Sequence, residues 1–352
     1  MSPPGAGAGH WAGRRVLVTG GASFIASHLI DELVARGAEV RAVDDLSSGV
    51  LGNLDAHLRD GRIEFVHADL RDPGAARTAV RGVDVVFHLA ADHGGRGYID
   101  THQAACATNL VLDGVVFRAC VDAGVEKVVY ASSGCVYPTG LQDDPSTVRY
   151  LQEAAAGPPY EADNMYGWAK LMGEMSLRAF HADWGLRSAC CRYFTAYGPR
   201  AHVNHAVMAM IARAFTDQDP FEVWGTGEQI RNWTHVHDIV AGTLLAGELI
   251  DDARAVNIGT MERIRVIDAA RETLRYMGKE HVAIQLRPEM PTGPMNRVAD
   301  NALAKELLGW EPTVSFRDGL RSTIDHFVET ADAEELRADL PALLLSTRSL
   351  AH

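Results

Sequence analysis

The sequence is short of cysteine, of basic residues and of long apolar runs, and each shortage excludes a class of protein. Acidic residues outnumber basic ones 46 to 33, a formal charge of −13, so nucleic acid is not an expected partner. We recognise no apolar run of membrane-span length and no signal segment, and we predict a cytoplasmic protein with no membrane partner. The five cysteines are odd in number and lack metal-ligand spacing, which favours a reducing interior over a disulfide framework; they are Cys106, Cys120, Cys135, Cys190 and Cys191.

Short apolar runs alternate with helical patterns, which predicts an α/β fold with a Rossmann-type, doubly wound parallel sheet. The first run, residues 15–19, leads through Gly20 into a helix expected from about Phe24 to Arg36. A strand, a small-residue turn and a helix in this order are the context of a dinucleotide-binding turn, where the helix N-terminus meets the pyrophosphate. Taken alone, the same pattern also fits an ordinary strand–helix turn.

An acidic residue after the second expected strand, residues 39–43, supports the dinucleotide interpretation. Asp44 can accept hydrogen bonds from the adenosine ribose and disfavours a 2′-phosphate, so we predict NAD rather than NADP. Two further strands are expected at residues 63–67 and 83–89, and the residues that follow each strand are expected to contact the cofactor. The predicted cofactor-binding residues are Gly20, Ser23, Phe24, Ile25, Asp44, Asp69, Leu70, Leu89, Ala90, Ala91, Tyr166 and Lys170.

Tyr166 and Lys170 are four residues apart at the start of an expected helix, so they share one face. A lysine ammonium one turn from a phenol favours the phenolate. Ser133, at the end of a strand expected at residues 127–131, can hydrogen-bond the same reacting oxygen. This combination is suited to removing a proton from an alcohol while a hydride leaves its carbon.

These motifs resemble the extended short-chain dehydrogenases/reductases, in the group of nucleotide-sugar epimerases and dehydratases, from about Arg14 to Val328. Ser23 and Ala26 stand at the second and third glycines of that group's turn, and Ser23 crowds the pyrophosphate slightly. The matching residues are Thr19-Gly20, Asp44, Asp69-Leu70, His88-Leu89-Ala90-Ala91, Asn109, Ser133, Tyr166, Lys170, Arg192-Tyr193-Phe194, Tyr197-Gly198-Pro199, Arg231, Asp238 and Asn257-Ile258-Gly259.

Within this group, three segments are similar to the GDP-mannose 3,5-epimerases: residues 89–99, residues 132–138 and the run Phe221 to Arg231. The resemblance implies that Cys135 removes a proton beside a 4-keto sugar; from its position alone, the thiol is equally a small buried filler. That family's lysine acid/base is missing after Tyr197-Gly198-Pro199. His202 or His205 can supply the proton instead, or bind phosphate, or lie in a solvated loop.

The predicted substrate contacts follow from the same segments. Arg231 is the candidate for gripping a nucleotide diphosphate, with Arg297 in support, because a guanidinium matches phosphate geometry. Trp224 and Trp233 either stack on the ligand or pack in the core. The predicted substrate-binding residues are Gly94, Gly95, Arg96, Ser133, Cys135, Thr195, His205, Arg231 and Arg297, and the predicted catalytic residues are Tyr166, Lys170, Cys135, Ser133, His202 and His205.

We expect a mobile leader (residues 1–13), an NAD-binding domain (14–200), a smaller α/β substrate-binding domain (201–330, with some crossing of segments) and a C-terminal tail (331–352). The resemblance implies a homodimer paired through helices at about 104–123 and 166–184. The expected reaction is the NAD-dependent 3,5-epimerisation of GDP-mannose. The alternatives are another nucleotide-sugar epimerase acting at C4 or at one of C3 and C5, a dehydratase or decarboxylase of the same group, or a non-catalytic NAD-binding regulator.

Overall fold

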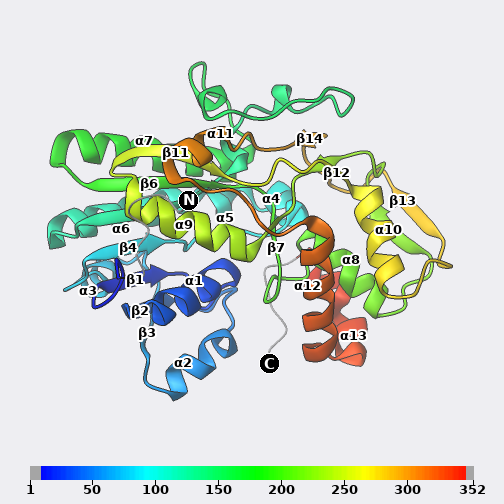
Figure 1. Ribbon diagram of the computed structural model, residues 1–352, viewed down its shortest axis with the longest axis horizontal. Coiled ribbons are helices and arrows are strands. Elements are labelled where there is room, and N and C mark those ends of the chain that lie inside the picture. The colour runs from blue at the N-terminus through cyan, green and yellow to red at the C-terminus, as the bar shows by residue number, and fades with distance from the viewer. Residues whose placement is uncertain (1–8, 346–352) are drawn as a thin grey trace.

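A seven-stranded parallel sheet forms the centre of the molecule, for which the computed structural model describes residues 9–345 (Figure 1). The strand order is β11-β6-β5-β4-β1-β2-β3, and every neighbouring pair is parallel. The predicted doubly wound sheet is therefore confirmed. The strands are β1 (Arg15–Thr19), β2 (Glu39–Asp44), β3 (Ile63–His67), β4 (Val85–His88), β5 (Lys127–Ser133), β6 (Arg187–Tyr193) and β11 (Asp252–Ile258).

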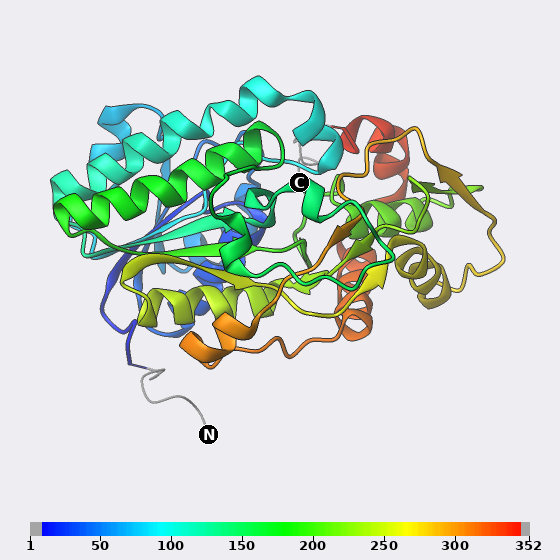
Figure 2. The same ribbon diagram turned by 90° about the horizontal axis from the view of Figure 1, so that it is seen from above.

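Helices cover both faces of this sheet, as Figure 2 shows from above. One layer contains α1 (Phe24–Ala35), α9 (Val236–Leu249) and α11 (Ala302–Leu308). The other contains α3 (Pro73–Ala79), α6 (Asn109–Ala123) and α7 (Asn164–Trp184). The chain turns from one half of the sheet to the other between β1 and β4, and the crevice at the carboxyl ends of such strands is where open α/β sheets bind ligands.

A smaller lobe packs beside these carboxyl ends (Figure 1). It has a parallel pair, β8 with β13, and a three-stranded sheet, β12-β9-β14. Its elements are α8 (Ala206–Phe215), β8 (Phe221–Trp224), β9 (Ile230–Arg231), β12 (Ile264–Arg265), α10 (Val266–Tyr276), β13 (Ile284–Arg287), β14 (Asn296–Arg297), α12 (Phe316–Thr330) and α13 (Ala333–Leu343). The remaining short elements are η1 (Leu51–Leu54), α2 (Asp55–Arg59), α4 (Arg96–Thr101), α5 (Gln103–Ala107), η2 (Gly134–Val136), η3 (Thr139–Leu141), η4 (Glu153–Ala156), β7 (Ala196–Tyr197) and β10 (Thr234–His235).

The prediction that residues 1–13 form a mobile leader is wrong for Trp11, which lies in the described part of that segment. Trp11 is 1% exposed, packs on Phe87 of β4 and donates a hydrogen bond from Nε1 to Glu248 Oε1 at 2.7 Å. Residues 1–8 and 346–352 lie outside the described part of the chain. The boundary drawn at residue 200 stays a prediction, but β11 comes from beyond it and completes the central sheet.

One apolar helical run also differs from expectation. Residues Gln103–Ala123, which form α5 and α6, are long and apolar enough to cross a membrane by length and composition, so the prediction that no run has this length is wrong. The run is apolar because one face packs in the core beneath α7, with Val116 and Phe117 buried there.

A buried carboxylate joins α7 to the two strands beneath it. Glu174 accepts hydrogen bonds from Ser132 Oγ of β5 at 2.5 Å and from Arg192 Nε and Nη2 of β6 at 2.9 and 2.8 Å. Arg192 also donates to the hydroxyl of Tyr137 at 3.1 Å. Glu174 and Arg192 are 0% and 2% exposed, so neither charge has water as an alternative partner.

We predict that Glu174→Gln lowers the free energy of unfolding by about 3–5 kcal/mol, because it leaves the Arg192 guanidinium buried without a counter-ion. Urea titration of the purified variant measures this. Glu64→Gln is the matched control, since Glu64 pairs with Arg41 at the surface and exposed pairs contribute about 0–1 kcal/mol. Equal, small losses in both variants would contradict the prediction.

Candidate active site

Two adjoining cavities lie at the carboxyl ends of the central strands. The larger has a volume of ≈ 400 Å³ and reaches between the sheet and the smaller lobe; the smaller, of ≈ 90 Å³, lies over β2 and β3. Ser23, Ser48, Leu89 and Ala91 line both. All the residues predicted to bind cofactor or substrate, or to act in catalysis, line one of these two cavities. The structure thus brings them together, while their individual roles stay predictions.

The turn after β1 allows a ligand to approach the backbone closely. Gly20 has φ +67°, and a Cβ there would lie 2.9 Å from Ala90 Cα, so no larger residue fits. Ser23 Oγ donates to the Gly20 carbonyl at 2.6 Å, so the hydroxyl that was expected to crowd the pyrophosphate is tied back to the turn. The N-terminus of α1 follows, with no acidic residue in its first turn to compete with an anion.

The acid at the end of β2 is buried and oriented by the backbone. Asp44 is 7% exposed and accepts hydrogen bonds from the amides of Ala22 and Leu46 at 3.0 and 2.8 Å. Burial raises its pKa, although these two bonds act in the opposite direction. Asp69 is different: its hydrogen bonds with Arg71 lower its pKa.

Tyr166, Ser133 and Lys170 meet on the wall of the larger cavity. The Ser133 hydroxyl interacts with the Tyr166 phenol and acts to lower its pKa, while the contact of Ser133 with the reacting oxygen stays a prediction. The expected phenolate is not favoured, however, because burial raises the pKa of Tyr166 well above its ordinary value. Lys170 Nζ lies 5.8 Å from the Tyr166 ring centroid and 4.7 Å from that of Tyr130. Lys170 is 1% exposed, burial lowers its pKa, and Nζ has no hydrogen-bond partner among the described residues.

The backbone at Cys135 is clamped against the helix that carries Tyr166. The carbonyl of Cys135 accepts the amide of Asp163 at 2.8 Å. A Cβ at Gly167 would lie 2.2 Å from the same carbonyl, so only glycine allows this approach. As a result, Cys135 and Tyr166 pack in one cluster with Tyr98, the thiol being 7% exposed and on the cavity wall.

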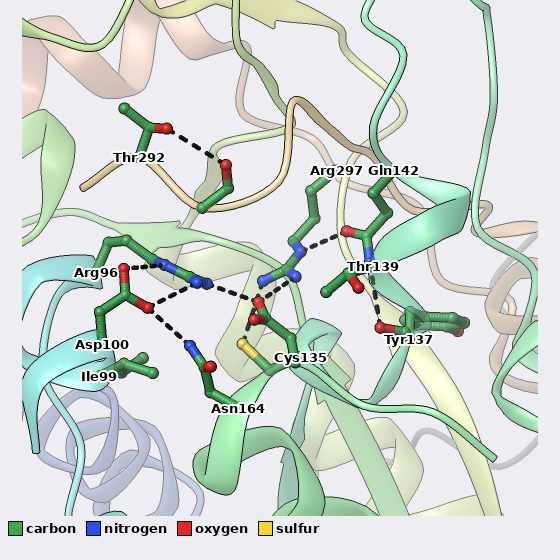
Figure 3. A network of polar contacts seen from close by, with 12 residues as sticks. Arg96, Ile99, Asp100, Cys135, Tyr137, Thr139, Gln142, Asn164, Thr292 and Arg297 are labelled. Carbon is green, nitrogen blue, oxygen red and sulfur yellow. Dashed lines mark hydrogen bonds and ion pairs between the residues drawn. The ribbon is translucent and has the colours of Figure 1, made fainter. Parts of the chain in front are cut away.

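A network of charges surrounds the Cys135 thiol (Figure 3). Arg297 donates from Nη1 to Cys135 Sγ at 3.1 Å, from Nη2 to Asp163 Oδ2 at 2.7 Å and from Nε to Gln142 Oε1 at 2.7 Å. Arg96 reaches the same Asp163 oxygen at 2.7 Å. Burial opposes the charge of Asp163, but Arg297 and Arg96 outweigh it and lower the pKa of the carboxyl.

Several histidines lie close to the phenol. The ring of His93 lies 4.9 Å from that of Tyr166 and 5.5 Å from that of His205, measured between centroids. Burial lowers the pKa of His93 to about 4 and that of His205 to about 3, so both imidazoles are neutral near pH 7. His202 lines the same cavity, and its Nδ1 accepts the amide of Asn204 at 3.1 Å.

Two arginines of the smaller lobe have lowered pKa values. Burial, with Arg297 and Arg96 nearby, lowers the pKa of Arg231 to about 9, and its Nη2 donates to the Thr292 carbonyl at 2.7 Å. Burial lowers the pKa of Arg213 to about 10. Both residues line the larger cavity. Such destabilised cations favour an anionic or acceptor-rich ligand.

The residues present fit NAD. Within residues 9–345, Lys170 Nζ is a buried donor without a partner at the carboxyl end of the sheet, where a ribose hydroxyl can accept its hydrogen bond. Gly20 and the N-terminus of α1 provide the close approach and the amide groups that a pyrophosphate requires. Asp44 and Asp69 lie in the smaller cavity, where the adenosine belongs.

Comparison with known proteins agrees with this geometry. Residues 16–259 match the NAD dependent epimerase/dehydratase family. GDP-mannose 3,5-epimerase 1 of Oryza sativa subsp. japonica is 32% identical over 328 residues, which cover 91% of this chain and 83% of that protein. A dTDP-glucose 4,6-dehydratase from Streptomyces venezuelae, solved with NAD bound, has a TM-score of 0.82 at 28% identity, covering 90% of this chain and 97% of that one. A UDP-glucose 4-epimerase from Thermotoga maritima, solved with UDP-glucose, has a TM-score of 0.79 at 29% identity, covering 90% and 100%.

The fold and the tyrosine–lysine pair define an NAD-dependent enzyme of the Rossmann type. The chain belongs to the NAD-dependent epimerase/dehydratase family, within the extended short-chain dehydrogenases/reductases. Its cofactor is NAD, as predicted. The three proteins compared above are named for nucleotide sugars: GDP-mannose, dTDP-glucose and UDP-glucose.

The predicted site residues do not include three that the structure places there: Asp163, Arg213 and His93. Asp163 joins Arg96 to Arg297, and only its position three residues before Tyr166 distinguishes it in the sequence. Arg213 is the single charged residue of the otherwise apolar helix α8, a signal that was available. His93 stands beside Tyr166, although only its neighbours Gly94, Gly95 and Arg96 were predicted to bind substrate.

We predict that the protein loses stability as the pH falls from about 6.5 towards 4. His28, His93 and His235 have pKa values lowered to about 4, and His205 to about 3, mainly by burial. Histidines in the unfolded chain bind protons near pH 6.5, so the unfolded state holds more protons than the folded state in this range. Each such histidine therefore lowers the free energy of unfolding by up to about 1.4 kcal/mol for each unit by which the pH falls. The stability that these neutral, buried histidines contribute is fully present above about pH 6.5 and is lost as the pH falls. Urea unfolding at pH 7, 6 and 5 measures it, with His93→Gln/His205→Gln expected to flatten the slope; a flat wild-type profile would contradict it.

We predict opposite effects of Lys170→Met on stability and on cofactor binding. Removing a buried ammonium without a partner should raise the unfolding free energy of the NAD-free protein by about 1–3 kcal/mol. It should also abolish most of the stabilisation that added NAD gives the wild type. Thermal unfolding with and without NAD tests both effects; an unchanged NAD-induced shift in the variant would show that Lys170 does not contact the cofactor.

Proposed function

We propose that the protein is a nucleotide-sugar epimerase of the GDP-mannose 3,5-epimerase type, an isomerase that oxidises the hexose at C4 and inverts the carbons beside it. One observation carries the proposal: the thiol of Cys135 is held beside the phenol of Tyr166 on one cavity wall by the close packing at Gly167. A base is needed next to the alcohol that is oxidised, and a thiol is a suitable one. The sequence similarity to GDP-mannose 3,5-epimerases supports the same substrate.

Oxidation begins at the sugar 4-hydroxyl. Tyr166 takes its proton, Ser133 hydrogen-bonds the same oxygen, and Lys170 orients the pair. When bound, NAD would supply the acceptor and later the donor of the C4 hydride, and Gly20, Asp44 and Lys170 would hold it. Because burial alone keeps Tyr166 protonated, the phenol becomes a base only in the complete complex.

Inversion follows at the carbons that flank the 4-ketone. Their hydrogens are acidic because the carbanion left behind is an enolate. Cys135 as thiolate removes the proton from one face, and the bonding electrons move into the enolate. A second group returns a proton to the opposite face. His202 and His205 are the candidates. Because burial keeps the imidazoles of His205 and of its neighbour His93 neutral near pH 7, His202 is the better proton donor of the three.

The diphosphate of the substrate is expected beside the guanidiniums of Arg231 and Arg297. Arg297 also donates hydrogen bonds to Cys135 and Asp163, so it would link the diphosphate to the thiol. Its hydrogen bond to the sulfur fixes the position of the Cys135 side chain on the cavity wall. Thr195, Gly94 and Gly95 complete the expected sugar contacts on the cavity wall.

We further propose a homodimer paired through α6 and α7, in the cytoplasm. These two helices lie against each other and carry exposed apolar side chains, which a second copy would bury: Leu110, Val111, Trp168, Met172 and Trp184. All five cysteines are free and buried, which suits a reducing compartment.

The test is proton NMR of GDP-mannose incubated with the enzyme in deuterium oxide. We expect deuterium at both C3 and C5 with the wild type. Cys135→Ser should retain oxidation at C4, seen as transient absorbance of reduced cofactor, but lose exchange by at least about 10²-fold, the usual contribution of a general base. Tyr166→Phe should lose both, because no group then accepts the hydroxyl proton.

Three outcomes would change the proposal. Deuterium at one carbon only would make the enzyme a single-site epimerase. Unchanged exchange in Cys135→Ser would show that the thiol is a buried filler. No exchange by an NAD-loaded, folded wild type would reject GDP-mannose and direct the same assay to UDP- and dTDP-sugars.

A further inference from the structure

A buried carboxylate on α6 lies close to the tyrosine–lysine pair and takes no part in the reaction described above. Asp113 is 3% exposed; its Oδ2 accepts the hydroxyl of Tyr130, and its Oδ1 lies 3.1 Å from His88 Nε2. A Cβ at Gly173 of α7 would collide with the same Tyr130 hydroxyl, so only glycine allows this approach. Tyr130 of β5 therefore contacts both helices, and Asp113 is tied to the packing beneath α7.

The hydrogen bonds around His88 determine where its proton lies. Thr19 Oγ1 accepts the amides of Leu89 and Ala90 at 3.1 and 3.0 Å, which uses both lone pairs of the hydroxyl oxygen. The hydroxyl proton of Thr19 therefore points to His88 Nδ1, 2.7 Å away. The imidazole keeps its own proton on Nε2, which donates to Asp113. Asp113 thus accepts both of its hydrogen bonds from neutral groups, an imidazole and a phenol, and neither brings a positive charge.

Tyr130 connects this carboxylate to Lys170. Its hydroxyl donates to Asp113, and the centroid of its ring lies 4.7 Å from Lys170 Nζ. Lys170 is 1% exposed, and its Nζ has no hydrogen-bond partner among the described residues. The charge of Asp113 raises the pKa of Lys170, against the larger effect of burial. A buried anion without a cationic hydrogen-bond donor and a buried cation without an acceptor thus contact the same tyrosine.

Within residues 9–345, the other titratable groups around Lys170 supply no free negative charge. These groups are Tyr130 of β5, Tyr166 and Glu174 of α7, and His93 after β4. Burial raises the pKa of both tyrosines well above the ordinary value and lowers that of His93 to about 4, so all three are neutral near pH 7. Glu174 is negative but forms an ion pair with Arg192 at 2.8 Å. Asp113 is therefore the anion available to Lys170 in this part of the structure.

We infer that Asp113 is a positioning residue, which keeps Lys170 in its charged form and so allows Lys170 to act on the phenol of Tyr166. A lysine favours a phenolate only while it carries its proton, and full burial works against that proton. Asp113 lines neither cavity, so it acts through Lys170 and does not touch the substrate. Through His88 and Thr19, the same carboxylate is also linked to the backbone at the end of β4, where the cofactor is expected.

Lysine NMR tests the inference directly, because the chain has four lysines: Lys127, Lys170, Lys279 and Lys305. With ¹³C at the lysine ε-carbon, Lys170 is the resonance lost in Lys170→Met, and a pH titration of the NAD-free protein gives its midpoint. We expect Asp113→Asn to lower this midpoint by about one pH unit or more, the usual effect of losing a nearby opposite charge. Asp122→Asn is the matched control on the same helix, because Asp122 pairs with Arg118 at the surface, and it should leave the midpoint unchanged.

A second measurement rests on the proposed function: the pH dependence of kcat/KM for GDP-mannose with the NAD-loaded enzyme. We expect Asp113→Asn to move the rising limb, on which the phenol loses its proton, to higher pH by about one unit, a roughly tenfold loss of activity on that limb. Loss of the Asp113 charge alone would act in the opposite direction, because that charge raises the pKa of Tyr166. The direction of the movement therefore separates an effect through Lys170 from a direct effect on the phenol.

A Lys170 midpoint in Asp113→Asn equal to or above that of the wild type would overturn the inference, as would a limb that stays in place or moves to lower pH. If Asp113→Asn does not fold, the wild type decides: a Lys170 that is already neutral at pH 7 would overturn the inference, and one that is charged there supports it. The NMR titration uses no sugar. A lowered midpoint without exchange in GDP-mannose would therefore reject the proposed reaction and leave the role of Asp113 standing, and exchange with an unchanged midpoint would do the reverse.

Discussion

The hydrogen bonds of the buried Glu174 carboxylate are the interaction on which the geometry of the candidate active site depends most. It joins the helix that carries Tyr166 and Lys170 to Ser132 of β5 and Arg192 of β6. Ser133 follows Ser132 directly, so the same carboxylate anchors the strand end that carries the Ser133 hydroxyl. An ion pair of this kind contributes less to net stability than its strength suggests, because both charges are desolvated. Its value lies in fixing the helix against the strand ends.

The cavity above these strands is lined by buried cationic side chains that lack hydrogen-bond acceptors among residues 9–345. Lys170 and Arg213 are buried donors without partners among residues 9–345, and burial lowers the pKa of both. Each costs stability in the empty protein, and each is relieved when a ligand supplies an acceptor. Asp163 has the opposite role: by pairing with Arg96 and Arg297, it keeps two further guanidiniums ordered beside the thiol.

The sequence predicted the sheet well because parallel strands are short apolar runs and their turns need small residues. It also located Tyr166, Lys170 and Ser133, since helix periodicity places the first two on one face. It did not predict that burial would keep Tyr166 protonated, because burial depends on side chains brought together from distant segments. Asp163 was missed for the same reason, as its partners lie 67 and 134 positions away. Trp11 was assigned to a mobile leader because its neighbours are Gly and Ala, yet its ring fills a pocket against Phe87.

The core that contains Trp11 also decides how the chain can fold during synthesis. Its members run from Trp11 through β1 and α1 to α9, β11 and Trp310, so the two halves share one apolar interior. The ribosome releases β4 well before β11, and at ~5–20 residues per second the first half waits on the order of ten seconds for the helix that covers it. Until then the part of this sheet face that α1 does not cover is exposed to chaperones and to other nascent chains. A fragment ending before α9 would keep that face uncovered, which makes the cofactor half a poor choice for separate expression.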